Sequence, residues 1–157
     1  MQNWIICLKH GDKYSSEYVN KLHNMVRRNC TLPFKFGCYT EKPEGIDPSI
    51  EIFPLPDIGM ISGWWYKPYF FNPNIPTQGR ILYFDLDVIV FKNIDQLFTW
   101  EPNQFCIIRD FNRHIRDDWK RMNSSVFRLS TGQHQYVWDN FIRQPEINSK
   151  KMHGDQD

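Results

Sequence analysis

The sequence predicts a single α/β domain, and three observations support this prediction. The chain has 157 residues, of which 41% are hydrophobic, and this is enough for one domain with a sizeable core. Its opening segment reads as an apolar strand, an amphipathic helix and a second strand. A beginning of this kind favours a sheet flanked by helices, in which ligands bind at the carboxyl ends of the strands.

Each element is predicted by its own pattern. Residues 3–8 form a short apolar run that is typical of a buried strand. Ser15 or Ser16 can cap a helix whose apolar positions 18, 19, 22, 25 and 26 fall on one face. The aromatic cluster at 62–71 predicts a helix with Pro68 in its first turn. Further strands are predicted at 35–39, 50–55, 80–84, 88–91, 105–108 and 126–129, and helices at 94–98 and 131–143, the last ended by Pro145.

Charge and composition exclude several classes of protein. The 19 basic and 18 acidic residues leave a net charge of +1, so the chain lacks the basic surplus of a general nucleic-acid binder. The hydrophobic content argues against a disordered chain. Aromatic residues make up 16% of the chain, which is a high share. They can form a core rich in aromatic side chains, and they can also stack on sugar-like ligands.

The four cysteines indicate a reducing compartment. Cys7, Cys30, Cys38 and Cys106 form no Cys-x-x-Cys pair, so we expect small buried hydrophobes rather than disulfides or a zinc site. The sequence shows no signal peptide, and no apolar run approaches the roughly 20 residues that span a bilayer. We therefore expect a cytoplasmic protein without an integral membrane segment.

The clearest chemical signal is a pair of carboxylates at the end of an apolar strand. Residues 80–84 lead directly into Asp85, Leu86 and Asp87. Two like charges so close together at the end of a buried strand call for a cation. In an extended chain they point the same way, so both could hold one Mn²⁺ or Mg²⁺ ion, which prefer oxygen ligands. The alternative is that one aspartate only caps the following turn.

At these residues the sequence resembles the nucleotide-sugar-dependent glycosyltransferases of the GT-A fold, in particular glycosyltransferase family 8. The resemblance is carried by segments 4–14, 63–67, 83–87 with 93–98, 122–126 and 154–157, in the family's order. It implies a Rossmann-like mixed sheet flanked by helices, in one domain spanning residues 1–157. Family members continue beyond the segment that resembles 154–157, so the domain is expected to lack their usual C-terminal portion.

The resemblance also implies roles for particular residues. Asp87 would ligate the metal directly, while Asp85 would contact the ribose or sugar and help to hold the ion. Lys67 would reach the donor sugar or Asp85, and Asn123 would bind donor-sugar hydroxyls. Two further donor-binding residues, Leu8 and Tyr14, belong to the opening strand and turn. Lys67 as a surface lysine and Asn123 as a turn former remain open alternatives.

The last residues of the chain complete the implied site. Asp155 and Gln156 would line the reacting face, where Asp155 binds sugar hydroxyls and Gln156 faces the anomeric carbon. The family's later metal-binding histidine has no counterpart, so water or His153 would supply the third ligand. A solvated polar tail is the alternative interpretation of 153–157.

These implications predict a metal-dependent hexosyltransferase that uses a nucleoside-diphosphate sugar, with UDP-sugar favoured. The acceptor would be a hydroxyl of a carbohydrate or glycoconjugate, and the anomeric configuration would be retained. One alternative is a module that binds nucleotide sugar without transferring it. Another is a haloacid-dehalogenase-like phosphatase with Asp85 as nucleophile, although 84 residues precede Asp85 and that family's nucleophile strand comes early.

Overall fold

The computed structural model describes residues 1–115, 118 and 120–152. These residues contain one six-stranded sheet with the order β3-β2-β1-β4-β6-β5. Strands β1 to β4 are parallel, whereas β6 is antiparallel to β4 and β5 is antiparallel to β6. The strands are β1 (Asn3–Lys9), β2 (Lys35–Thr40), β3 (Glu51–Phe53), β4 (Arg80–Phe84), β5 (Cys106–Arg109) and β6 (Met122–Ser130).

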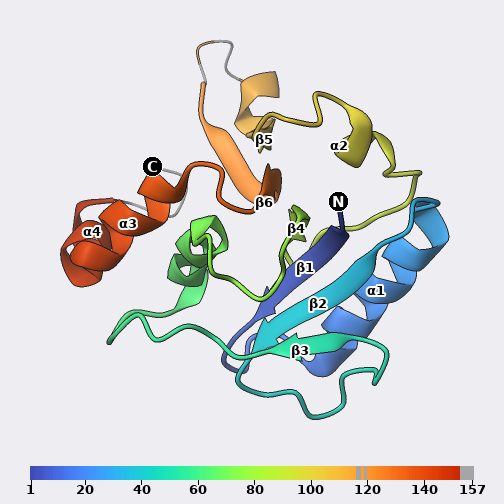
Figure 1. Ribbon diagram of the computed structural model, residues 1–157, viewed down its shortest axis with the longest axis horizontal. Helices are drawn as coiled ribbons and strands as arrows, with labels where there is room; N and C mark the ends of the chain where they lie inside the picture. Colours follow the sequence, from blue (N-terminus) through green and yellow to red (C-terminus); the bar gives the residue numbers. More distant parts are fainter. Residues whose placement is uncertain (116–117, 119, 153–157) are drawn as a thin grey trace.

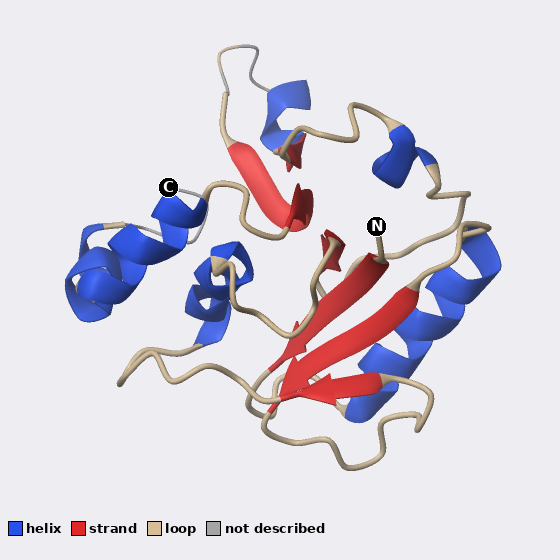
Figure 2. Ribbon diagram, viewed as in Figure 1, coloured by secondary structure: helices blue, strands red, loops and turns tan. Residues whose placement is uncertain are grey.

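Helices cover both faces of this sheet, as Figures 1 and 2 show. The α-helices are α1 (Ser16–Asn29), α2 (Gln96–Thr99), α3 (Gln135–Arg143) and α4 (Pro145–Lys151), and the 3-10 helices are η1 (Gly63–Phe71) and η2 (Phe111–His114). Alternation along β1 divides the core in two. Ile5 and Cys7 face α1, whereas Trp4, Ile6 and Leu8 face η1.

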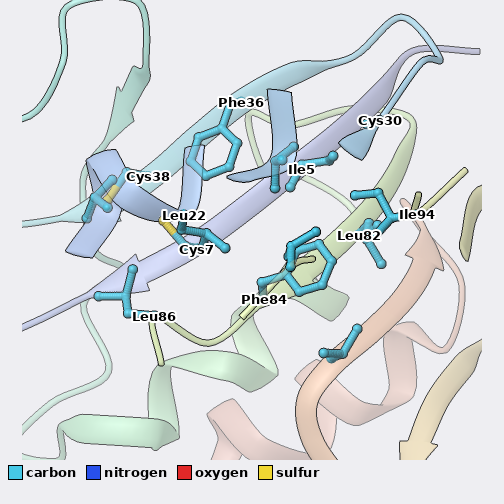
Figure 3. Close-up of a cluster of buried hydrophobic side chains, with 14 of the residues drawn as sticks. Ile5, Cys7, Leu22, Cys30, Phe36, Cys38, Leu82, Phe84, Leu86 and Ile94 are labelled. Atoms are coloured by element: carbon cyan, nitrogen blue, oxygen red, sulfur yellow. The ribbon is translucent and has the colours of Figure 1, made fainter. Parts of the chain in front are cut away.

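The α1-side cluster is the larger of the two and appears in Figure 3. It joins α1 residues such as Leu22 to Phe36 of β2, to Leu82 and Phe84 of β4, and to Ile94 just before α2. On the other face, α3 packs on η1, because Phe141 stacks on Trp65 at 6.0 Å between ring centroids. The helix η1 in turn packs on the sheet through Phe70, whose ring centroid lies 5.3 Å from that of Tyr83 in β4.

The predicted α/β class is confirmed, and most predicted elements occur within a few residues of their expected bounds. All four cysteines are free, and Cys7, Cys30 and Cys38 are buried, as expected. In the described part of the chain, no helix is long and apolar enough to cross a membrane.

Two local predictions were wrong, and one helix was not predicted. Residues 88–91 are not a strand. Val88 and Val90 pack on the core, whereas Ile89 and Phe91 are 73% and 76% exposed, so the segment has the alternating pattern of a strand. It cannot pair with β4, because β4 already has a neighbour on each side. The predicted aromatic helix is present as the 3-10 helix η1, but Pro68 lies inside it rather than in its first turn. Pro145 ends α3 as predicted, but it also begins α4, where its fixed φ suits a first turn.

Candidate functional site

The topology places one edge of the sheet in a position to bind ligands. The chain runs outward from β1 to β2 and β3, and then crosses back to β4 on the other side of β1. In open α/β sheets, the carboxyl ends of the strands at such a reversal border a crevice where ligands bind. The loop after β1 contains Lys13 and Tyr14, and the loop after β4 contains Asp85 and Asp87. The candidate site is therefore the meeting point of these two loops, which the hydrogen bond between Tyr14 and Asp87 joins.

Asp85 lies immediately beyond β4 and is held on three sides. Its backbone N–H donates to the carbonyl oxygen of Ser125, at 2.8 Å. Its carboxylate accepts a hydrogen bond from the Tyr83 hydroxyl at 2.6 Å, and it forms an ion pair with Lys67. The Lys67 Nζ atom is 3.0 Å from Oδ1 and 3.1 Å from Oδ2. Because its side chain is only 25% exposed, Asp85 is a partly enclosed carboxylate whose charge is already balanced.

Lys67 reaches Asp85 from η1 and is itself buried, at 7% exposure. Besides the carboxylate, its ammonium donates to the Ser124 hydroxyl at 3.0 Å and to the Ser124 carbonyl at 3.4 Å. It also lies 5.4 Å from the centroid of the Tyr83 ring. The open alternative of a surface lysine is therefore wrong, and the expected contact between Lys67 and Asp85 is present.

Asp87 differs from Asp85 because it lies in an exposed turn rather than at a strand end. Its Oδ2 accepts a hydrogen bond from the Tyr14 hydroxyl at 2.9 Å. Partial burial raises the pKa of Tyr14, and the bond to the Asp87 carboxylate raises it further, so the phenol stays protonated and can donate. The strand ends at Phe84, so the extended geometry expected to align the two carboxylates is absent, and each aspartate has its own partners.

Asn123 and Leu8 occupy less accessible positions. Asn123 is 7% exposed near the start of β6, and its Oδ1 accepts the N–H of Ser125 at 2.8 Å. This bond is the turn-like contact that the alternative interpretation expects, and it leaves the amide nitrogen for other partners. Leu8 is 8% exposed and packs in the η1-side cluster. Donor binding by either residue stays a prediction.

The remaining predicted residues, His153, Asp155 and Gln156, lie outside the described residues, so their roles also stay predictions. Within the described ranges, no group of three or more His, Cys, Asp or Glu side chains is arranged to hold a metal ion. The donors at hand still fit a hard cation, because Mg²⁺ sites commonly use one or two carboxylates and complete their shell with water and substrate phosphates. Asp87 fits such a cation best, since Asp85 is engaged by Lys67 and Tyr83.

The site also contains residues that the sequence interpretation did not single out. Tyr83 is two positions before Asp85, and period-2 alternation could have indicated that both lie on one side of the chain. Ser124 had no such signal, because its contact with Lys67 joins residues 57 positions apart. Lys13 lies between β1 and α1, and its ammonium is 4.8 Å from the centroid of the Tyr14 ring.

Comparison with known proteins supports the fold. No family model and no curated protein matches the sequence. Among solved structures, glycosyltransferase GlyE of Streptococcus pneumoniae TIGR4 superposes with a TM-score of 0.68 at 13% identity, over 99% of this chain and 41% of GlyE. An active-site mutant of LgtC gives 0.66 at 13% identity, over 98% of this chain and 67% of LgtC. Galactosyltransferase LgtC in complex with donor and acceptor sugar analogs gives 0.64 at 15% identity, over 98% and 68%.

These similarities confirm the predicted fold, a mixed sheet flanked by helices like that of GT-A glycosyltransferases. The chain spans about two fifths of the length of GlyE and about two thirds of the length of LgtC. At these levels of identity, the similarity concerns the fold alone. The activity must therefore be argued from the site.

Proposed function

We propose that this chain is a metal-dependent glycosyltransferase domain. In this proposal it transfers a hexosyl group from a nucleoside-diphosphate sugar, with UDP-sugar favoured, to a hydroxyl of a carbohydrate or glycoconjugate. The observation that carries the proposal is the location of Asp85 and Asp87. They follow β4 at the reversal point of the sheet, in a fold similar to those of solved glycosyltransferases.

In this proposal, the residues around the two carboxylates have different roles. Asp87, in its exposed turn, would hold Mn²⁺ or Mg²⁺, with Tyr14 positioning its carboxylate. Asp85, fixed by Lys67 and Tyr83, would accept hydrogen bonds from hydroxyls of the ribose or sugar. When bound, the cation would neutralise charge on the leaving diphosphate. Asn123 would bind sugar hydroxyls, and Asp155 and Gln156 would line the reacting face.

The same fold and site would serve a domain that binds nucleotide sugar without transferring it. Both functions require the donor site, so binding must be measured before transfer. The phosphatase alternative needs Asp85 as an attacking nucleophile, and hydrolysis of p-nitrophenyl phosphate would identify it.

The first experiment is a thermal-shift comparison of UDP, GDP, CMP and ADP, each with Mn²⁺ and with EDTA. At a hundredfold its Kd, a ligand stabilises the fold by about 2.7 kcal/mol, which raises the Tm by roughly 5–10 °C. We expect such a shift for UDP with Mn²⁺ and its loss in EDTA. If no nucleotide shifts the Tm, the donor site is refuted, and phosphatase substrates become the next test.

A matched pair of variants then tests the carboxylate assignment. Asp87→Asn should abolish the Mn²⁺-dependent shift, because the amide removes the charge that would hold the cation. Glu51→Gln is the control: Glu51 pairs with Lys35 at 2.9 Å where β2 and β3 begin, at the opposite edge of the sheet. It should retain the full shift. Retention of the shift in Asp87→Asn would contradict the metal assignment.

Turnover distinguishes the two functions that share the site. The protein is incubated with UDP-hexoses, Mn²⁺ and simple glycosides, and both UDP release and glycoside product are measured. Formation of product with the donor's anomeric configuration is expected for a retaining transferase. Nucleotide binding without product would favour the binding module.

A further inference from the structure

We propose that Lys13 is a specificity-determining residue that contacts the diphosphate of the donor. This inference rests on the proposed function and deepens it by naming the group that the exposed side of the site recognises. Lys13 follows β1 in the loop that leads to α1, directly before Tyr14. It lay outside the set of donor-binding residues predicted from the sequence.

The first argument is geometric. The Lys13 ammonium lies 4.8 Å from the centroid of the Tyr14 ring, and the hydroxyl of that ring donates to Asp87 Oδ2 at 2.9 Å. A cation over an aromatic face is attracted by the ring quadrupole, so the flexible lysine is held beside the carboxylate turn. The Tyr14 ring is fixed in turn by its edge-to-face contact with Tyr18 of α1, at 4.9 Å between centroids.

The second argument compares the two lysines of the site. Lys67 is buried and committed to Asp85 and Ser124, so its ammonium is part of the wall of the site. Lys13 is exposed, and its partner is a neutral phenol rather than a carboxylate. The pKa of Lys13 is raised, first by its hydrogen bond with Tyr14 and more weakly by the charges of Asp87 and Asp85. It is therefore fully protonated at neutral pH and able to meet an incoming anion.

The third argument is charge balance. Two lysines and two aspartates make the site close to neutral before any ligand arrives. A divalent cation would leave two positive charges, which match the two negative charges of a sugar-linked diphosphate. Asp12 does not disturb this balance, because it forms an ion pair with Lys42 at 2.5 Å. Glu41 and Lys9 also lie beside this loop, and their opposite charges offset each other. Burial lowers the pKa of His10, which favours its neutral form. Without Lys13, only one positive charge would remain to balance the two negative charges of the diphosphate.

The test measures UDP and uridine binding by isothermal titration calorimetry in Mn²⁺, for wild type, Lys13→Met and Lys35→Met. Lys35 is the matched control, because its ammonium also lies over a ring, 5.1 Å from Trp4, and near Glu51, but at the opposite edge of the sheet. We expect Lys13→Met to weaken UDP about tenfold and to leave uridine within about twofold, since only UDP presents the phosphates. Lys35→Met should bind both as wild type does.

Two further readouts make the outcome decisive. Lys13→Arg should recover most of the UDP affinity, and Lys13→Met should weaken the salt dependence of UDP binding. The inference is overturned if Lys13→Met binds UDP as tightly as wild type, or if it weakens uridine and UDP equally. Absence of nucleotide binding in wild type would overturn the proposed function and this inference together. Failure of the proposed function is therefore seen in wild type, whereas failure of this inference alone is seen only when wild type binds UDP and is compared with Lys13→Met.

Discussion

Two of the buried cations, Lys67 and Arg128, differ in their surroundings. Lys67 is 7% exposed and faces the Asp85 carboxylate at the ligand edge of the sheet. Arg128 of β6 is 2% exposed on the face that α2 covers. Its Nη1 donates to the carbonyls of Leu97 and Trp100, at 2.7 and 2.6 Å. Its Nη2 donates to the carbonyls of Glu101 and Gln104, at 2.5 and 3.0 Å, and to Cys106 Sγ at 3.0 Å.

The difference shows how a buried charge can serve either binding or architecture. The charge of Lys67 is balanced by the Asp85 carboxylate, which is 25% exposed and, in the proposed function, open to the donor. Among the described residues, Arg128 contacts carbonyl dipoles instead, and it gathers the segment from Leu97 to Cys106 around one guanidinium. Only arginine offers five donors in a planar fork, so this role is specific to its side chain.

The largest expected effect comes from Arg128→Met. Methionine fills similar space but takes the guanidinium donors away from the four partly buried carbonyls, of which that of Glu101 keeps the Gln104 N–H. We expect the free energy of unfolding to fall by about 3 kcal/mol, measured by urea denaturation. Arg128→Lys keeps the charge but has fewer hydrogen-bond donors, so its free energy of unfolding should lie between those of wild type and Arg128→Met. Wild-type stability in Arg128→Met would show that the carbonyls find other partners.

Lys67→Met should have an intermediate effect on stability and a large one on binding. It leaves the Asp85 carboxylate partly enclosed beside Tyr83 without its counter-charge, at a cost of about 2 kcal/mol. UDP binding in Mn²⁺ should also be lost, because Asp85 is no longer held in place. In Arg128→Met, by contrast, the fraction that remains folded should bind UDP normally.

A double-mutant cycle measures the Lys67–Asp85 coupling directly. Asp85→Asn combined with Lys67→Met removes both charges, so the double variant should be more stable than the sum of the two single effects predicts, by about 1–2 kcal/mol. Additive effects would mean that the ion pair contributes nothing and that Lys67 acts through packing alone.

The two cations also show what the sequence could predict. The apolar run before Asp85 was enough to predict β4 and the location of the carboxylates at its end. Arg128 was correctly placed within a strand, but alternation alone would assign it to an exposed face. Its burial depends on α2 and the following loop, which are distant in sequence. Long-range packing of this kind leaves no local periodic signal.

The same reasoning explains the site. Lys67 and Tyr14 were identified only through the family resemblance, because their partners lie 18 and 73 positions away. The predicted strand at 88–91 had the right alternation, yet a strand also needs a partner, and β4, the strand just before it in the chain, already pairs with β1 and β6. Burial patterns were therefore predictable where a segment contributes to the sheet, and less so where it only packs against it.

The smallest expected effect concerns the segment that supplies the acceptors of Arg128. Asp95 precedes α2 and accepts hydrogen bonds from the Thr31 backbone and hydroxyl and from the Asn93 amide. The Thr31 hydroxyl, followed by Asn93, holds the pKa of Asp95 well below its ordinary value of 3.8. A lowered pKa means that the fold stabilises the ionised carboxylate. Its contribution is therefore complete above the ordinary pKa and is lost as pH falls through the folded value.

Thr31→Val tests this contribution, because it removes the hydroxyl and keeps the volume. We expect the urea midpoint of wild type to fall more steeply between about pH 5 and pH 3 than that of Thr31→Val. Some slope remains in both proteins, because hydrogen bonds also lower the pKa of Asp12 and Asp47. Thr99→Val is the matched control: the Thr99 hydroxyl donates to the Asp95 backbone carbonyl, so the wild-type slope should persist. Equal slopes in all three proteins would mean that the α2 end of the Arg128 cluster is tied down by packing rather than by the charge of Asp95.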